Sequence, residues 1–176
     1  MTRAPEITCL TYCSLPYAGG GWPQSCVNVL SQFASQSIRP LLFVPRRRAA
    51  GPADIEFISC LGFPLSRLPW RQVQPVAERQ LMRVFKRYLD RADPRSTIAC
   101  LWPGTPPDIV EHARRRGIVT VREMINCTMA MAKPILDRAY ERAGLPLGHT
   151  ISEAAAEAER DELSLYDYAF ASNPLA

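Results

Sequence analysis

Short apolar runs alternate along the chain with segments in which apolar residues recur at helical spacing. The run at positions 7–13 is apolar on both faces, which is typical of a strand in a parallel sheet covered by helices on both sides. Runs with strand character recur at positions 40–45, 55–61, 97–102, 117–121 and 168–172. The pattern therefore predicts a series of strands separated by helical segments.

Helices are predicted between these strands. The first has an apolar face over positions 26–34, and the longest begins at Arg71 and ends before the break at Asp93 and Pro94. A further helix is expected over positions 129–144, where Gly144 ends it and Pro134 starts or bends it. This alternation predicts a doubly wound, mostly parallel α/β sheet with helices on both faces.

Two of the predicted helices have capping signals at their starts. Thr105 is expected to cap one of them, with Pro106 in the first turn and Asp108 near the positive end of the helix dipole. Thr150 and Glu153 have the spacing of a capping box and are expected to open the last helix. No internal repeat or linker divides positions 1–176, so a single domain is predicted.

Composition and charge narrow the functional classes. The net charge of +4 is mild and the arginines are dispersed, so no nucleic-acid partner is predicted. The exception is the run 46–48, RRR, which we interpret as a solvated loop, with contact to an anionic membrane or a phosphate as the weaker alternative. The six cysteines lack metal-type spacing, so neither a metal nor another cofactor is expected.

The cysteines and the absence of targeting signals also bear on location. Most of the cysteines lie inside apolar segments, as buried free thiols do in a reducing compartment. The N-terminal residues do not resemble a secretory signal, and no apolar run approaches the ~18 residues that a membrane span requires. The predicted location is cytoplasmic, with a peripheral contact to the inner face of the membrane left open.

Three consecutive glycines, Gly19, Gly20 and Gly21, stand between the first strand and the first helix. Such a turn brings backbone N–H groups close to a ligand, and a helix N-terminus favours negative charge, so a phosphate is the natural occupant. The dinucleotide-binding fingerprint is absent, because no glycine follows at the required offset and no acidic residue closes the second strand. A tight turn without a ligand is at least as good an interpretation of the triplet alone.

The position of the triplet favours the functional interpretation. In open α/β sheets, ligands bind beyond the carboxyl ends of the strands. The glycine loop, Pro103 and Gly104, and the segment after Val121 are all expected at that edge. Three candidate loops therefore converge there.

The loop 16–21, PYAGGG, resembles the one after the first strand in glycosyltransferases of the GT-B fold, particularly the retaining family-four group. The stretches LWPGT, VREMIN, AKPILDRAYERAGLP and ERDELSLYDYAFASNP follow in the order seen in the N-terminal domain of that group. The resemblance covers nearly the whole chain. It implies a Rossmann-like, acceptor-side domain, with a nucleotide-sugar donor held by a second α/β domain expected after Ala176.

The resemblance assigns Gly19, Gly20 and Gly21 to the loop near the donor diphosphate and the acceptor. Many relatives have a histidine after the fifth strand, where this chain has Arg122, Glu123 and, slightly later, Asn126.

We expect Glu123 to accept a proton from an acceptor hydroxyl and Arg122 to pair with a phosphate or carboxylate, although a surface ion pair is an equal alternative. Trp22, Gly104, Asn126 and Ser172 are further candidates for lining the cleft.

Two function classes follow. The first is the N-terminal half of a glycosyltransferase, inactive alone, whose acceptor is a sugar or a lipid-linked sugar. The second is a non-catalytic α/β module that binds a phosphorylated ligand or a protein. An orphaned half should expose an apolar patch, with Trp22, Phe63 and Trp70 as candidates, whereas a stand-alone module should be polar there.

Overall fold

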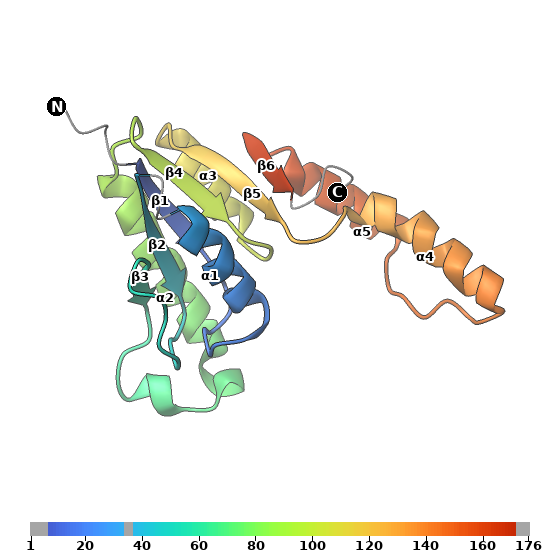
Figure 1. Ribbon diagram of the computed structural model, residues 1–176, viewed down its shortest axis with the longest axis horizontal. Coiled ribbons are helices and arrows are strands. Elements are labelled where there is room, and N and C mark those ends of the chain that lie inside the picture. The colour runs from blue at the N-terminus through green and yellow to red at the C-terminus, as the bar shows by residue number, and fades with distance from the viewer. Residues whose placement is uncertain (1–6, 34–36, 172–176) are drawn as a thin grey trace.

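The computed structural model describes residues 7–33 and 37–171, which contain one six-stranded sheet (Figure 1). Every neighbouring pair of strands is parallel, and the order is β3-β2-β1-β4-β5-β6. The prediction of a doubly wound parallel sheet is confirmed. The strands are β1 (Ile7–Tyr12), β2 (Ile38–Val44), β3 (Glu56–Ser59), β4 (Thr97–Leu101), β5 (Val119–Met124) and β6 (Tyr168–Ala171).

Helices cover both faces of the central strands. On one face, α1 (Gly21–Phe33) packs Cys26, Val27 and Leu30 against β1, β2 and the end of β4. On the other face lie α2 (Trp70–Arg91) and α3 (Pro107–Arg115). A short 3-10 helix, η2 (Leu65–Arg67), lies in the connection before α2. The alternation of side chains along each strand thus fills two separate apolar cores.

Aromatic packing anchors the α2 side of the sheet. The ring of Phe85, fully buried on α2, meets Phe43 of β2 edge to face at 4.9 Å and Tyr12 of β1 at 5.3 Å. Such edge-to-face pairs stabilise a core beyond the area they bury. The α2 face of the central strands is therefore closely packed.

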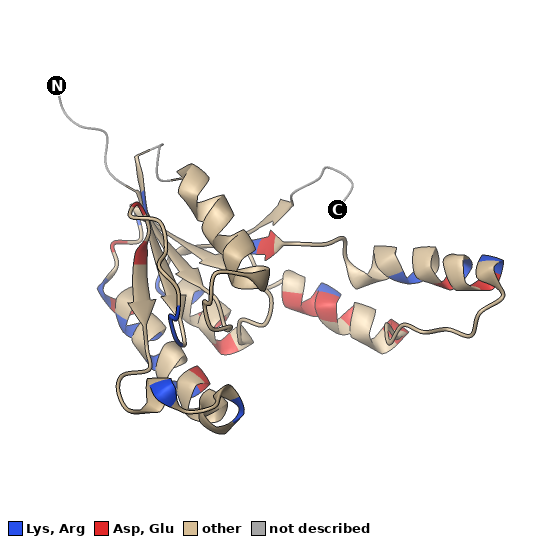
Figure 2. Cartoon of the chain, turned by 60° about the horizontal axis from the view of Figure 1, so that its bottom comes forward, with Lys and Arg blue, Asp and Glu red and all other residues tan. Residues whose placement is uncertain are grey.

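The C-terminal part of the chain departs from this compact arrangement. Helices α4 (Met129–Ala143) and α5 (Glu153–Leu163) form a hairpin that projects away from the sheet in both views (Figure 1, Figure 2). Among its described residues α4 buries none, and α5 buries only Ala156. We call this hairpin, residues 129–163, the arm. It leaves apolar side chains such as Ile135 exposed.

Helix starts differ from the sequence prediction in two places. The side chain of Ser152, not Thr150, caps α5 by accepting a hydrogen bond from the Ala155 N–H. Helix α3 begins at Pro107, and the Thr105 hydroxyl instead donates to the Trp102 carbonyl at 2.6 Å. The helix thus begins two residues later than the capping signal suggested for α5 and one residue later for α3.

Two other local predictions can be compared with the structure. Thr128 caps α4, so Pro134 lies inside that helix and does not start it, and Gly144 ends it in the left-handed conformation, as expected. The fifth strand continues three residues past the predicted end at Val121, to Met124. Among the described residues, no helix combines the length and the apolar character needed to cross a bilayer.

Candidate functional site

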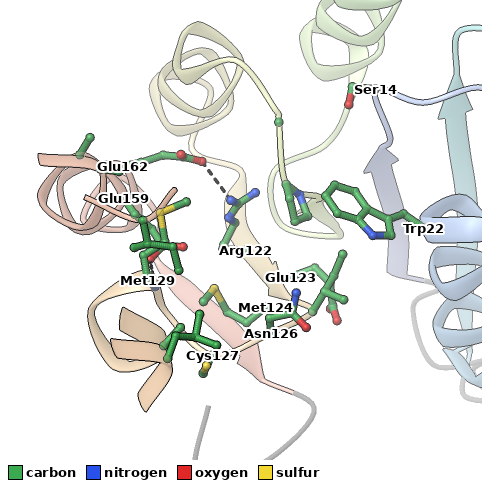
Figure 3. A pocket seen from close by; sticks show the side chains of 18 of the residues that line it. Ser14, Trp22, Arg122, Glu123, Met124, Asn126, Cys127, Met129, Glu159 and Glu162 are labelled. Carbon is green, nitrogen blue, oxygen red and sulfur yellow. Dashed lines mark hydrogen bonds and ion pairs between the residues drawn. The ribbon is translucent and has the colours of Figure 1, made fainter. Parts of the chain in front are cut away.

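The carboxyl ends of the strands border the largest cavity that we describe, about 950 Å³ in volume. Strand order reverses between β1 and β4, and such a switch point is where open α/β sheets bind ligands. Trp22, Gly104, Arg122, Glu123 and Asn126 all line this cavity (Figure 3). We call it the β5 cavity. Five of the candidate residues from the sequence are thereby brought together.

Glu123 has the most unusual environment in the cavity. Only 3% of the residue is exposed, and its Oε2 atom is buried without a hydrogen-bond partner among the described residues. Burial removes water from the charged form and raises the pKa of this carboxyl from 4.5 to about 7. A carboxyl in this state exchanges its proton near neutral pH.

Arg122 is the neighbouring buried charge, with 6% of the residue exposed. Its Nη2 lies 3.2 Å from Oε1 of Glu162 on α5, and its guanidinium carbon lies 5.7 Å from the centre of the Tyr166 ring. The Nε and Nη1 atoms are buried without hydrogen-bond partners in the described part of the chain. Because buried donors are normally paired, these two point to an acceptor that a ligand supplies.

The two charges reach the cavity from opposite faces of β5. Successive strand residues alternate between faces, so Arg122 points toward Tyr166 and α5 while Glu123 lies on the α1 side. Burial raises the pKa of the Cys26 thiol on α1, and the charge of Glu123 contributes in the same direction. The separation explains why Arg122 pairs with Glu162 and leaves the Glu123 carboxyl unpaired.

The arm supplies the second wall of the cavity. Side chains of Met129, Ile135 and Leu136 on α4 face it together with Ile151, which precedes α5. On α5, Glu159 also lines the cavity, where its Oε2 accepts a hydrogen bond from the Met129 N–H. The cavity therefore has a charged floor at β5 and a largely apolar wall on the arm.

The glycine loop lies elsewhere on the same edge. Gly19, Gly20 and Gly21 are exposed between β1 and α1, and Gly19 and Gly21 have positive φ angles, which glycine adopts readily. None of the three lines the β5 cavity. Gly21 instead lines a smaller hollow of about 550 Å³ together with Arg46 and Trp70.

The run of arginines at 46–48 is also different from the expected solvated loop. Arg47 and Arg48 are exposed, but only 4% of Arg46 is exposed. Its Nη1 donates to the carbonyls of Ser66 and Leu68, at 3.1 and 2.8 Å. The interpretation was wrong for this one residue, because the connection around η2 folds over it.

Asn126 and Ser172 complete the set of candidates. Asn126 is exposed at the rim of the β5 cavity, while Ser172 lies outside the described residues. The Oδ2 atom of Asp167, just before β6, accepts hydrogen bonds from the N–H and hydroxyl of Thr120, at 2.9 and 2.8 Å. Asp167 thus ties β6 to β5.

Sequence reasoning missed Glu162 and Tyr166 as neighbours of Arg122. Both lie about forty positions later, on α5 and directly after it, and only the return of the chain to pair β6 with β5 brings them to the site. In the sequence, the only indication of Glu162 was the spacing of the acidic residues along α5, and this spacing alone is typical of a solvent-exposed helix face.

Comparison of the chain with family models, with curated proteins and with solved structures finds no match at a significant level. The resemblance to GT-B glycosyltransferases therefore remains a prediction from the sequence motifs.

Proposed function

We propose that this chain is the acceptor-side half of a glycosyltransferase, which moves a sugar from a nucleotide-sugar donor to an acceptor hydroxyl. The observation that carries the proposal is the Glu123 carboxyl, buried and unpaired at the end of β5 in the β5 cavity, with a pKa of about 7. A group that ionises near the working pH is suited to accept a proton from a hydroxyl.

In the proposed transfer one bond forms at the anomeric carbon and one bond to it breaks. The acceptor oxygen bonds to the anomeric carbon of the donor, the bond from that carbon to the diphosphate breaks, and the hydroxyl proton passes to the Glu123 carboxylate. The free Nε and Nη1 donors of Arg122 would hold a phosphate or carboxylate of the reactants. The family resemblance implies that the anomeric configuration is retained.

Exposed apolar surface supports the idea that another unit completes the site. Trp22 is 52% exposed at the edge of the β5 cavity, and Ile135 is 55% exposed on the arm that forms its second wall. Exposed apolar groups around a cavity are typical of a surface that a partner or ligand covers. The donor nucleotide would then be held by a second α/β unit, and the chain alone would not transfer sugar.

The apolar wall on the arm also suits the lipid part of a lipid-linked acceptor. Met129, Ile135 and Leu136 offer no hydrogen-bonding groups, so a hydrocarbon chain could lie against them without leaving polar atoms unpaired. Such an acceptor would bring the protein to a membrane surface as a peripheral protein.

A non-catalytic binding module is the second candidate. The unpaired donors of Arg122 and the unpaired oxygen of Glu123 would equally serve to bind a phosphorylated ligand without chemistry. This alternative predicts binding of a phosphorylated ligand at Arg122 without binding of a neutral oligosaccharide.

Calorimetric titration of the 176-residue chain distinguishes these functions. Maltotriose, cellotriose and chitotriose serve as acceptor probes, and UDP-glucose and GDP-mannose as donor probes. We expect at least one oligosaccharide to bind with a Kd of about 1 mM or tighter, and the nucleotide sugars to bind more weakly. Binding should shift the Glu123 carboxyl signal in a ¹³C spectrum and change its titration.

Two matched variants complete the design. Glu123→Gln should alter the pH dependence of oligosaccharide binding, whereas Glu157→Gln, an exposed glutamate on α5, should leave it unchanged. Nucleotide-sugar binding tighter than about 10 µM without saccharide binding would contradict the acceptor-side assignment. Sugar transfer by the chain alone would contradict the need for a second unit.

A further inference from the structure

The small hollow beside the glycine loop has a buried cation without a counter-ion. Arg46, with 4% exposed, forms no ion pair with any described acidic residue, and its Nε atom is buried without a hydrogen-bond partner. Desolvation lowers its pKa, and the nearby charge of Arg48 lowers it further. An uncompensated buried charge is expensive, so this arrangement calls for an anion.

The first turn of α1 lies at the same hollow. Gly21, its first residue, and Trp22 both line the hollow, and no acidic residue occupies that turn. The N–H groups of Gly21 and Trp22 and the dipole of this 13-residue helix therefore add to the positive potential from Arg46. Two independent features, the helix end and a buried guanidinium without an ion pair to a described acidic residue, thus favour negative charge at one place.

Aromatic and apolar side chains form the rest of the hollow. Trp22 and Trp70 line it with Leu15, Pro16 and Pro23, and the guanidinium carbon of Arg46 lies 5.7 Å from the centre of the Trp70 ring. An exposed indole offers a flat face to a ring with an apolar side. The hollow is therefore suited to a ring that also bears an anionic group.

We propose that this hollow, which we call the Arg46 subsite, binds an acidic sugar, with its carboxylate or phosphate at Arg46 and its ring against the two indoles. This inference rests on the proposed function, because it names the class of acceptor. Leu15 and Trp22 line both the Arg46 subsite and the β5 cavity. An acceptor with its acidic group at Arg46 would thus extend past Trp22 toward Glu123.

The test uses the indole N–H signals of the 176-residue chain in ¹⁵N spectra. The probes are methyl glucuronide, glucose 6-phosphate, the neutral methyl glucoside, inorganic phosphate and uridine monophosphate. We expect the two acidic sugars to shift Trp22 and Trp70, while Trp102, buried in the core behind α1, serves as an internal reference. The two acidic sugars should bind about tenfold more tightly than methyl glucoside. The tighter of the two identifies the anion as a carboxylate or a phosphate.

Variants separate the subsite from general charge effects. Arg46→Gln should reduce the affinity for acidic sugars about tenfold, to the level of the neutral sugar, whereas Arg71→Gln, an exposed arginine beside Trp70, should change it less than about twofold. Trp22→Leu should weaken all the sugars alike.

Other outcomes overturn the proposal. Equal binding of the neutral sugar would remove the role of charge, and tighter binding of phosphate alone would remove the role of the sugar ring. Tighter binding of uridine monophosphate would assign the hollow to a nucleotide and not to an acidic sugar. If Arg46→Gln does not fold, salt provides the test on the unaltered protein. Raising NaCl from about 0.05 to about 0.5 M should weaken glucuronide binding but not glucoside binding, and an equal effect on both would refute the subsite.

The result is independent of sugar transfer. Binding of acidic sugars at Trp22 and Trp70, without any response of Glu123 to oligosaccharides, would sink the proposed function and leave the subsite in place. Oligosaccharide binding at Glu123 with no preference for acidic sugars would do the reverse.

Discussion

Replacing Glu123 by glutamine should remove most of the pH dependence of stability between about pH 5 and about pH 8. Burial raises the pKa of this carboxyl in the folded protein from 4.5 to about 7. Between these two values the folded state holds the proton and the unfolded state does not, so the free energy of unfolding falls as the pH rises through this window. Above the folded pKa the loss is complete.

The size of the effect follows from the difference in pKa. A rise of about 2.5 in the pKa of Glu123 corresponds to a loss of about 3 kcal/mol in the free energy of unfolding, at 1.36 kcal/mol for each tenfold change in proton affinity. Relaxation of the β5 cavity and entry of water reduce this value, so it is an upper estimate. Glutamine resembles the protonated acid and cannot ionise, so the variant should match the parent near pH 5 and exceed it near pH 8.

Urea denaturation at both pH values measures this difference. Glu157→Gln, which changes an exposed carboxylate on α5, should follow the parent protein and corrects for the loss of one negative charge. If Glu123→Gln and the parent lose stability in parallel from pH 5 to pH 8, the carboxyl is not held neutral by burial. The chemical role proposed for it would then lose its basis.

Three further predictions concern the α2 core, the cap of α5 and the contact between Asp167 and Thr120. Phe85→Ala should destabilise the protein by about 3–5 kcal/mol in urea denaturation, because it empties the centre of the α2 core. Phe63→Ala, at an exposed ring, should change the stability by less than about 0.5 kcal/mol. Equal losses of stability would contradict the assigned core. Ser152→Ala should lower the free energy of unfolding by about 1 kcal/mol in the same measurement, and Thr150→Ala should lower it much less, because the Ser152 side chain caps α5. The opposite order would support the capping box predicted at Thr150 and Glu153. Hydrogen bonds from Thr120, chiefly from its backbone N–H, lower the pKa of the Asp167 carboxyl, so the stabilisation of β6 should be lost as the pH falls through that pKa. Asp167→Asn should speed the amide hydrogen exchange of Thr120 at neutral pH. Unchanged exchange would refute this contact between Asp167 and Thr120.

The overall fold could be predicted because its signals are local. Strands that are apolar on both faces, separated by helices, have few arrangements other than a doubly wound sheet, since crossovers between parallel strands are right-handed. The six predicted strands all occur, and the helix predicted from Arg71 begins at Trp70. The predicted end of β5 was wrong, because the charged residues Arg122 and Glu123 suggested a loop although β5 continues to Met124.

The position of the candidate site could be predicted in part. Parallel strands place their carboxyl ends at one edge, so Gly104, Arg122 and Glu123 were expected together there, and they line one cavity. The glycine loop could not be assigned to a particular cavity, because the direction in which a short loop turns depends on the elements packed against it. Gly21 lines the hollow that contains Arg46 and does not line the cavity that contains Glu123.

Burial of individual charges is the property that the sequence concealed most completely. Arg46, Arg47 and Arg48 are chemically identical, yet only Arg46 is enclosed, because the carbonyls of Ser66 and Leu68 reach it from a connection about twenty residues away. The carbonyls satisfy one nitrogen and leave the charge itself unbalanced, since a carbonyl is a dipole and not a counter-ion. A chain that needed only to stabilise this connection would be served by an uncharged donor at position 46. The charge at this position therefore favours an anion that arrives from outside the chain, which is the reason for testing Arg46 with acidic sugars before any other ligand.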